Sequence, residues 1–160
     1  MNFYRSLGFL VFGSRLKRLS DVFLNDVNNI YKKQKIAFDA AWFPVFYILS
    51  AKKQVTIREI SEDLNISHSA ASQLISGLQL KGLLTSVQSK TDARKKAVSL
   101  TVKGEKLLLK IKPVWDALEK AMEQLAAEGK ESKKILKALD EMEKNMEQKS
   151  VLTRVESLLK

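Results

Sequence analysis

A short stretch in the middle of the chain is rich in small, uncharged hydrogen-bonding side chains. These residues are Ser67, His68, Ser69, Ser72, Gln73 and Ser76. On one face of a helix they form a narrow, acid-free surface, which suits passage between the phosphate rows of a DNA major groove. The Gln73 amide can make a bidentate contact with adenine, and the serines suit phosphates or either base type. Ser67 and the helix N-terminal amides suit a phosphate.

A second group of residues is basic and follows soon after. It consists of Lys90, Asp92, Arg94, Lys95 and Lys96. An arginine at a hairpin tip can enter a narrow A·T-rich minor groove, and Asp92 can orient its guanidinium. The lysines would bind phosphates and release counterions. The plainer interpretation, a solvated loop, describes most charge runs, but the position beside the acid-free stretch favours DNA contact.

The charge distribution and composition narrow the possible partners. Residues 81–103 include six basic residues and one acidic residue, so this segment alone holds half of the chain's net charge of +10. Such an excess of positive charge favours nucleic acid or an anionic membrane surface as the partner.

The chain has no cysteine, which excludes disulfides, thiolate nucleophiles and zinc–thiolate sites and fits a cytoplasmic location. No apolar run approaches the ~18 residues of a membrane span, so we expect no membrane partner.

Local signals place both groups on consecutive elements. Thr56 and Glu59 form a capping box that opens a short helix. Ser67 then caps a second helix, the reader helix, predicted over about 67–81. After Gly82 the period changes, which predicts a hairpin, the wing, over about 83–100 with a turn at Lys90 to Lys96. Two short helices followed by a basic hairpin form a winged helix-turn-helix pattern.

Longer helices are expected on both sides. One covers the N-terminal third, a second covers Phe43 to Lys52 with Pro44 in its first turn, and a third runs from Thr101 past Leu125. Pro113 predicts a kink in the third helix. A last helical region contains Ile135 to Met146, and Val151 to Leu159 either continues it or forms a separate helix. These helices have more apolar positions than one small core needs, which favours a homodimer over a self-contained helical subdomain.

Other candidate sites are weaker. Trp42, Phe46 and Tyr47 either line a ligand pocket or belong to the core, as aromatic residues at helical spacing usually do. His68 is the only histidine, so no metal site is expected. No nucleophile elbow, phosphate-binding glycine loop or Ser-His-Asp order is visible, so we expect neither an enzyme nor a cofactor.

Three stretches resemble the MarR (multiple antibiotic resistance regulator) family. They are residues 57–64, residues 67–74, and Asp92-Ala93-Arg94-Lys95-Lys96 running into Ser99-Leu100-Thr101-Val102-Lys103-Gly104. The last matches the family's wing motif, an Asp-x-Arg, a strand and then Leu-Thr-x-x-Gly. Many members carry a basic residue where this chain has Gln73, which favours an adenine preference here.

The resemblance implies an obligate homodimer on a pseudopalindromic operator, with reader helices in major grooves and wing arginines in minor grooves. It also suggests a small aromatic or anionic ligand that weakens DNA binding, and the lack of cysteine excludes the family's peroxide-sensing mechanism. We therefore expect a mostly α fold with a small β-hairpin wing. Residues 1–35 and 105–160 would supply dimerisation helices around a winged helix-turn-helix domain at 36–104, all folded as one unit.

The predicted function is sequence-specific binding of double-stranded DNA as a transcriptional regulator, with repression favoured over activation. A second hypothesis is a winged-helix module that binds another protein without specific DNA binding. A third is a membrane-surface protein with basic amphipathic helices. The acid-free reader face and the basic wing favour the first.

Overall fold

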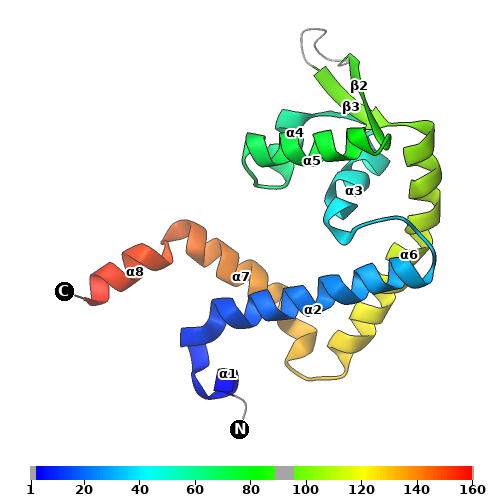
Figure 1. The fold of residues 1–160 in the computed structure, drawn as a ribbon. Coiled ribbons are helices and arrows are strands. Elements are labelled where there is room, and N and C mark those ends of the chain that lie inside the picture. Colours follow the sequence, from blue (N-terminus) through cyan, green and yellow to red (C-terminus); the bar gives the residue numbers. More distant parts are fainter. Residues whose placement is uncertain (1–2, 89–95, 160) are drawn as a thin grey trace. The chain divides into compact units, whose positions relative to one another are not determined.

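The computed structural model describes residues 3–88 and 96–159 and is mostly helical (Figure 1). It contains two compact units, Met1–Val114 and Trp115–Lys160. Within the described residues, no helix combines the length and apolar character needed to cross a membrane. The expected fold class, mostly α with a small β wing, is confirmed.

The first unit begins with short N-terminal turns and one long helix. The elements are α1 (Phe3–Ser6), a 3-10 turn (Gly8–Val11), α2 (Phe12–Lys33), a second 3-10 turn (Ala40–Trp42) and α3 (Phe43–Lys52). The bounds of α3 are the predicted ones, with Pro44 in its first turn. Proline is tolerated there because the first amides of a helix have no partner within it.

The winged helix-turn-helix elements come next in the same unit. They are β1 (Gln54–Thr56), α4 (Ile57–Asp63), α5 (His68–Leu80), β2 (Leu84–Gln88) and β3 (Lys96–Leu100), followed by α6 (Val102–Ala127). The reader helix is thus α5, and β2 and β3 are the two strands of the wing. The boundary between the two units falls within α6, directly after Val114, and Pro113 lies inside the helix.

The sheet has three antiparallel strands rather than the two that were predicted. Their order is β1-β3-β2, so β3 lies in the middle. Val55 is opposite Val98 on one side of β3, and Ala97 is opposite Val87 on the other. β1 was not predicted, because three residues are too few to show an alternating pattern.

The core of the first unit is apolar and has two parts. Ile60, Ala71, Ile75 and Leu78 bury the facing sides of α4 and α5. An aromatic cluster surrounds Phe38, whose ring centre lies 4.9 Å from that of Tyr31, 5.1 Å from Phe46 and 5.6 Å from Trp42, all edge-to-face. Edge-to-face aromatic contacts add to the stabilisation from burial alone. The aromatic cluster therefore joins α2 to α3 through Phe38.

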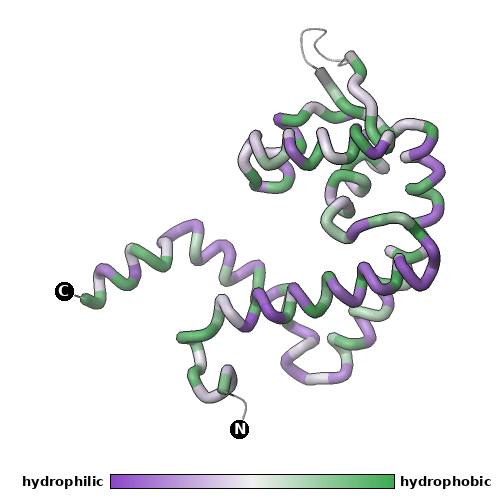
Figure 2. Tube along the Cα trace, in the orientation of Figure 1, coloured by the Kyte–Doolittle hydropathy of each residue, from purple (hydrophilic) through white to green (hydrophobic). Residues whose placement is uncertain are grey.

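The second unit contains the rest of α6, a 3-10 turn (Ser132–Lys134), α7 (Ile135–Gln148) and α8 (Val151–Leu158). The Ser150 hydroxyl accepts a hydrogen bond from the Thr153 amide at 3.2 Å, so α8 starts at a new N-cap and is a separate helix. Neither α7 nor α8 contains a buried residue. Figure 2 shows that apolar and polar residues alternate along both helices, which is typical of a helix with one face to cover.

Candidate nucleic-acid interface

The exposed face of α5 consists of the predicted hydrogen-bonding residues. Ser67 is the N-cap, and its hydroxyl accepts a hydrogen bond from the Ala70 amide at 3.1 Å. His68, Ser69, Gln73 and Ser76 are exposed, and Ser72 is half-buried. The opposite face is buried in the core, so the orientation of the helix is fixed by packing. Neutral polar side chains are therefore presented to solvent along one side of α5.

The preceding helix is held by its capping box. The Thr56 hydroxyl and the Thr56 amide both donate to Oε2 of Glu59, at 2.7 and 2.6 Å, and the Glu59 amide donates back to the hydroxyl. The hydroxyl bond, followed by the amide bond, lowers the pKa of Glu59 below its ordinary value, because both bonds favour the carboxylate. The start of α4 is thus fixed by a reciprocal hydrogen-bond pair.

The other acidic side chains of α4 form ion pairs with basic side chains. Arg58 Nε donates to Oε1 of Glu62 at 2.7 Å, and Lys52 Nζ lies 2.6 Å from Oδ2 of Asp63. Exposed pairs of this kind contribute little to stability. They do neutralise carboxylates on the helix that precedes the reader helix, which reduces repulsion toward a polyanion.

The turn between the two helices is tight. Asn65 adopts a φ of 49°, and the amides of Asn65 and Ile66 donate to Glu62 and Ser61 carbonyls at 3.2 and 3.0 Å. Asparagine tolerates this left-handed conformation better than most residues. The predicted turn at Asn65 and Ile66 is therefore present and closes the helix-turn-helix.

A side-chain hydrogen bond joins the reader helix to the wing. Nε2 of Gln79 donates to Oγ of Ser86 in β2 at 2.9 Å. Sequence reasoning missed Gln79, because its partner is on another element and no local pattern marks the pair. The bond fixes the base of the wing beside the C-terminal half of α5.

The tip of the wing lies outside the described residues. This applies to Lys90, Asp92, Arg94 and Lys95, and for Lys96 only the backbone, the first residue of β3, is described. The roles predicted for these residues therefore stay predictions. The described strands place the two ends of the tip, at Gln88 and Lys96, opposite each other in the β2–β3 register.

A cluster at the C-terminal end of α5 anchors it to α6. The Thr101 hydroxyl donates to the Gly82 carbonyl at 2.7 Å and accepts from the Gly104 amide at 3.0 Å. Nζ of Lys103 donates to the Lys81 carbonyl at 2.7 Å. A Cβ on Gly104 would collide with the carbonyl oxygen of Leu83. The Leu-Thr-x-x-Gly motif is thus a clamp that sets where α6 leaves the wing.

The three aromatic residues proposed for a ligand pocket are not brought together in one cavity. Phe46 is fully buried in the core against Phe38. Tyr47 is exposed, with its ring beside Phe43. Trp42 lines a cavity of about 700 Å³. Phe46 therefore follows the core alternative, which the helical spacing of these aromatic residues had left open beside the pocket.

No cluster of three or more metal-ligating residues occurs in the part of the chain that the structure describes. His68 is exposed at the start of α5.

Comparison with known proteins identifies the domain. Residues 38–95 match the MarR family. This part of the chain is thus similar to a MarR-family domain. Proteins of the MarR family are transcriptional regulators rather than enzymes. No curated protein sequence matches the chain.

Solved structures with this fold extend over most of the chain. The Staphylococcus aureus MepR–DNA complex covers 87% of this chain and 99% of its own at 18% identity, with a TM-score of 0.69. A MarR/EmrR family regulator from Acinetobacter sp. ADP1 covers 92% and 99% at 19% identity, with a TM-score of 0.66. Bordetella bronchiseptica BpsR covers 82% and 91% at 20% identity, with a TM-score of 0.65. At these identities the likeness establishes the fold.

Proposed function

We propose that the chain is a transcriptional repressor that binds double-stranded DNA sequence-specifically as a homodimer. The observation that carries the proposal is the exposed, acid-free polar face of α5, held beside the base of a basic wing by the Gln79–Ser86 hydrogen bond. In this arrangement Gln73 and Ser72 contact bases in the major groove, and Ser67 and the first amides of α5 contact a phosphate. His68, Ser69 and Ser76 border the same groove.

The wing would extend the contact to the neighbouring minor groove. Arg94 enters that groove, oriented by Asp92, while Lys90, Lys95 and Lys96 contact phosphates. The likeness to the MepR–DNA complex, and to CouR bound to a 23-mer duplex at 23% identity and a TM-score of 0.63, supports this docking. Both solved folds are seen with DNA.

Exposed apolar side chains support the homodimer. On α2 they are Leu16, Leu19, Val22 and Leu24; on α7 they include Ile135, Leu136, Met142 and Met146. A single chain with so much exposed apolar surface needs a partner. A two-fold dimer would match two half-sites about 34–36 Å apart on a pseudopalindrome.

Release of the operator by a small ligand is part of the proposal. The BpsR structure concerns regulation of DNA binding by 6-hydroxynicotinic acid. An inducing ligand of this chain would bind the DNA-free conformation more tightly.

The direct test is selection of bound duplexes from a random pool, followed by fluorescence anisotropy on the selected duplex. We expect a palindromic consensus and an affinity that falls steeply with salt, because phosphate contacts release counterions. A protein-binding winged helix would enrich no sequence and show no steep salt dependence. That result would refute the proposal.

A further inference from the structure

The segment that precedes the long helix α2 exposes large apolar side chains. In the single chain Phe3 is 67% exposed, Phe9 87% and Leu10 90%. Phe9 and Leu10 lie in the 3-10 turn, which contains no buried residue. Large apolar side chains gathered on one exposed segment mark a surface that binds a partner. We call residues 3–12 the aromatic turn.

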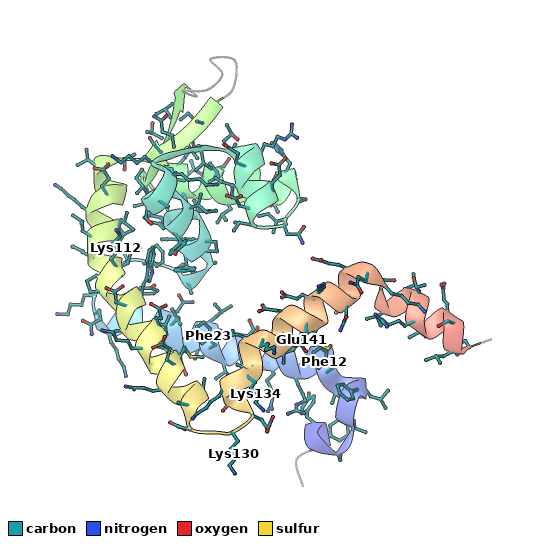
Figure 3. All side chains as sticks on the ribbon, turned by 180° about the vertical axis from the view of Figure 1, so that it is seen from behind. Phe12, Phe23, Lys112, Lys130, Lys134 and Glu141 are labelled. Atoms are coloured by element: carbon teal, nitrogen blue, oxygen red, sulfur yellow. The ribbon has the colours of Figure 1, made fainter. Side chains whose placement is uncertain are left out.

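Ring contacts give the aromatic turn a defined structure. The Arg18 guanidinium of α2 lies 5.2 Å from the ring centre of Tyr4, and the Tyr4 ring is edge-to-face with that of Phe3 at 5.7 Å. The ring centres of Phe9 and Phe12 lie 6.4 Å apart, and Phe12 is labelled in Figure 3. The aromatic rings and an arginine are therefore held together before any partner binds.

A bend at Gly8 leads into the most exposed part of the aromatic turn. Gly8 has a φ of 55°, a conformation that glycine adopts without strain. Figure 1 shows α1 and the beginning of α2 on either side of this bend. Phe9 and Leu10 follow Gly8 directly, so they can enter an apolar layer without displacing either helix.

The same part of the chain is basic. Residues 3–20 contain Arg5, Arg15, Lys17 and Arg18 and no acidic residue. The nearest carboxylate along the chain, that of Asp21, accepts from Lys17 Nζ at 2.8 and 3.0 Å. Arg15 and Arg18 are exposed, and neither forms an ion pair within the described residues. The partner should therefore be anionic as well as apolar.

We propose that the aromatic turn docks on the surface of an anionic lipid bilayer. Phe9 and Leu10 enter the boundary between head groups and acyl chains, and Arg15 and Arg18 contact lipid phosphates. Such a bilayer has an apolar layer directly below a negative surface, so it matches both properties of the segment. A second copy of the chain would bring the same arginines to the contact, where like charges repel.

Docking on a bilayer surface is a different mode of binding from spanning it. The expectation of no membrane partner was drawn from the lack of a spanning run, and a segment that docks on the surface needs none. The proposal does not rest on DNA binding either, because no residue of the reader helix or the wing takes part.

Cosedimentation of the DNA-free protein with vesicles tests the docking. One set of vesicles contains equal parts of phosphatidylcholine and phosphatidylglycerol, and the other contains phosphatidylcholine alone. We expect binding to the anionic set that weakens as salt is raised, and at least about tenfold weaker binding to the neutral set. No binding to the anionic set, or equal binding to both, would overturn the proposal.

A matched pair of double variants tests the apolar contact. Phe9→Ser with Leu10→Ser should weaken binding to the anionic vesicles about tenfold, because the inserted side chains are lost. Leu80→Ser with Leu158→Ser changes two side chains of the same kind that are 90% and 85% exposed elsewhere, and it should weaken binding by less than about twofold. Equal effects would refute the assignment to the aromatic turn.

A second pair tests the charges at constant net charge. Arg15→Gln with Arg18→Gln should weaken binding to the anionic vesicles about tenfold. Lys106→Gln with Lys110→Gln removes two charges from the cavity beside Trp42 and should weaken binding by less than about twofold. If both pairs lost the same affinity, the overall positive charge would explain the binding and the proposal would fail.

Fluorescence reports whether the aromatic turn enters the bilayer. Relative to the parent, Phe9→Trp should gain emission that is quenched when the anionic vesicles contain phosphatidylcholine brominated on its acyl chains. Leu80→Trp, at a position of similar exposure on α5, should gain emission that these lipids do not quench. Equal quenching of both, or of neither, would contradict insertion at Phe9.

Light scattering separates the bilayer from a second copy as the partner. The Phe9→Ser, Leu10→Ser variant should have the same mass as the parent in solution. A lower mass would make the aromatic turn an interface between copies and overturn the proposal. All of these measurements use the DNA-free protein, so failure of the repressor function would leave them intact.

Discussion

Nε2 of Gln79 lies 2.9 Å from Oγ of Ser86, and this hydrogen bond connects the reader helix with the first strand of the wing. Gln79 is six residues beyond Gln73 on the same helix. Neither Gln79 nor Ser86 is predicted to contact DNA. The pair sets the angle between two surfaces that must reach one duplex together. Its contribution to DNA binding should therefore exceed its contribution to folding.

Gln79→Ala and Ser86→Ala are the variants that test this connection. Each should lower the DNA affinity by up to about tenfold, because the net value of one hydrogen bond is about 0.5–1.5 kcal/mol. The double variant should lose little more than either single one, since both remove the same bond. Anisotropy with the selected duplex measures the cycle, and additive losses would show that the two residues act separately.

Gln73 is the residue expected to read sequence. Gln73→Ala should relax preference at one or two base pairs, at a cost of about 1–3 kcal/mol for the preferred duplex. Repeating the selection with the variant measures this directly. If Gln73→Ala instead caused a uniform loss of affinity across all sequences, Gln73 would be a contact to the DNA backbone.

Arg94 is the residue predicted to contact the minor groove. Arg94→Ala should weaken DNA binding about tenfold at fixed salt, and an unchanged binding isotherm would refute the predicted contact.

Gly104 is expected to be intolerant of any side chain. Its Cβ would meet the Leu83 carbonyl oxygen, a backbone atom that cannot move without displacing the start of β2. Gly104→Ala should therefore lower the free energy of unfolding by about 1–3 kcal/mol. Gly77→Ala is the matched control, because nothing lies within 4 Å of its added Cβ. In the middle of α5 it should stabilise by about 0.5–1 kcal/mol, as measured by urea denaturation.

Acid should weaken the capping box at the start of α4. The pKa of Glu59 is lower in the folded chain than its ordinary value of 4.5, mainly through the hydroxyl and amide of Thr56. A lowered folded pKa gives stability that is complete above 4.5 and is lost as the pH falls through the folded value. The stability difference between the parent and Glu59→Gln should thus shrink on acidification below 4.5. Urea titrations of both proteins across this range measure the difference.

The exposed apolar face of α2 provides a test of assembly. Leu19 is 59% exposed in the single chain. Leu19→Glu would place a charge in the proposed dimer interface, and sedimentation should then report the mass of one chain. Leu80→Glu, at a position 90% exposed at the end of α5, is the control and should leave the mass unchanged. An unaltered mass for both variants would remove α2 from the interface.

Helix starts were predictable from the sequence because their signals are local. Thr56 with Glu59, and Ser67, each cap the predicted helix, and α3 has the predicted bounds. The choice left open at Ser150 was decided by a hydrogen bond to Thr153, three residues away. At the N-terminus, residues 7–12 were expected within a helix. Instead, Leu7 precedes a 3-10 turn (Gly8–Val11) that begins at Gly8 with a φ of 55°, and α2 starts at Phe12.

The features that connect distant segments were not predictable. β1 exists because Val55 pairs with Val98, 43 positions later. The contacts of Gln79 with Ser86, and of Lys103 with Lys81, depend on how helices and strands pack. Composition indicated a basic region at 81–103, but only packing shows that Lys81 and Lys103 line a cavity together with Trp42. Hydrophobic periodicity specifies the helices and strands. It does not specify which side chains of one helix or strand contact those of another.

Thr56 has two structural duties at once. It is the last residue of β1, opposite Ala97 in the central strand, and it is also the N-cap of α4. No hinge residue separates the sheet from the helix-turn-helix, so a tilt of β3 must be passed on to α4 in the same movement. The reader helix and the wing would then move together as one rigid body. A bent or twisted operator would have to deform to fit them, and the free-energy cost of that deformation would be borne by the duplex.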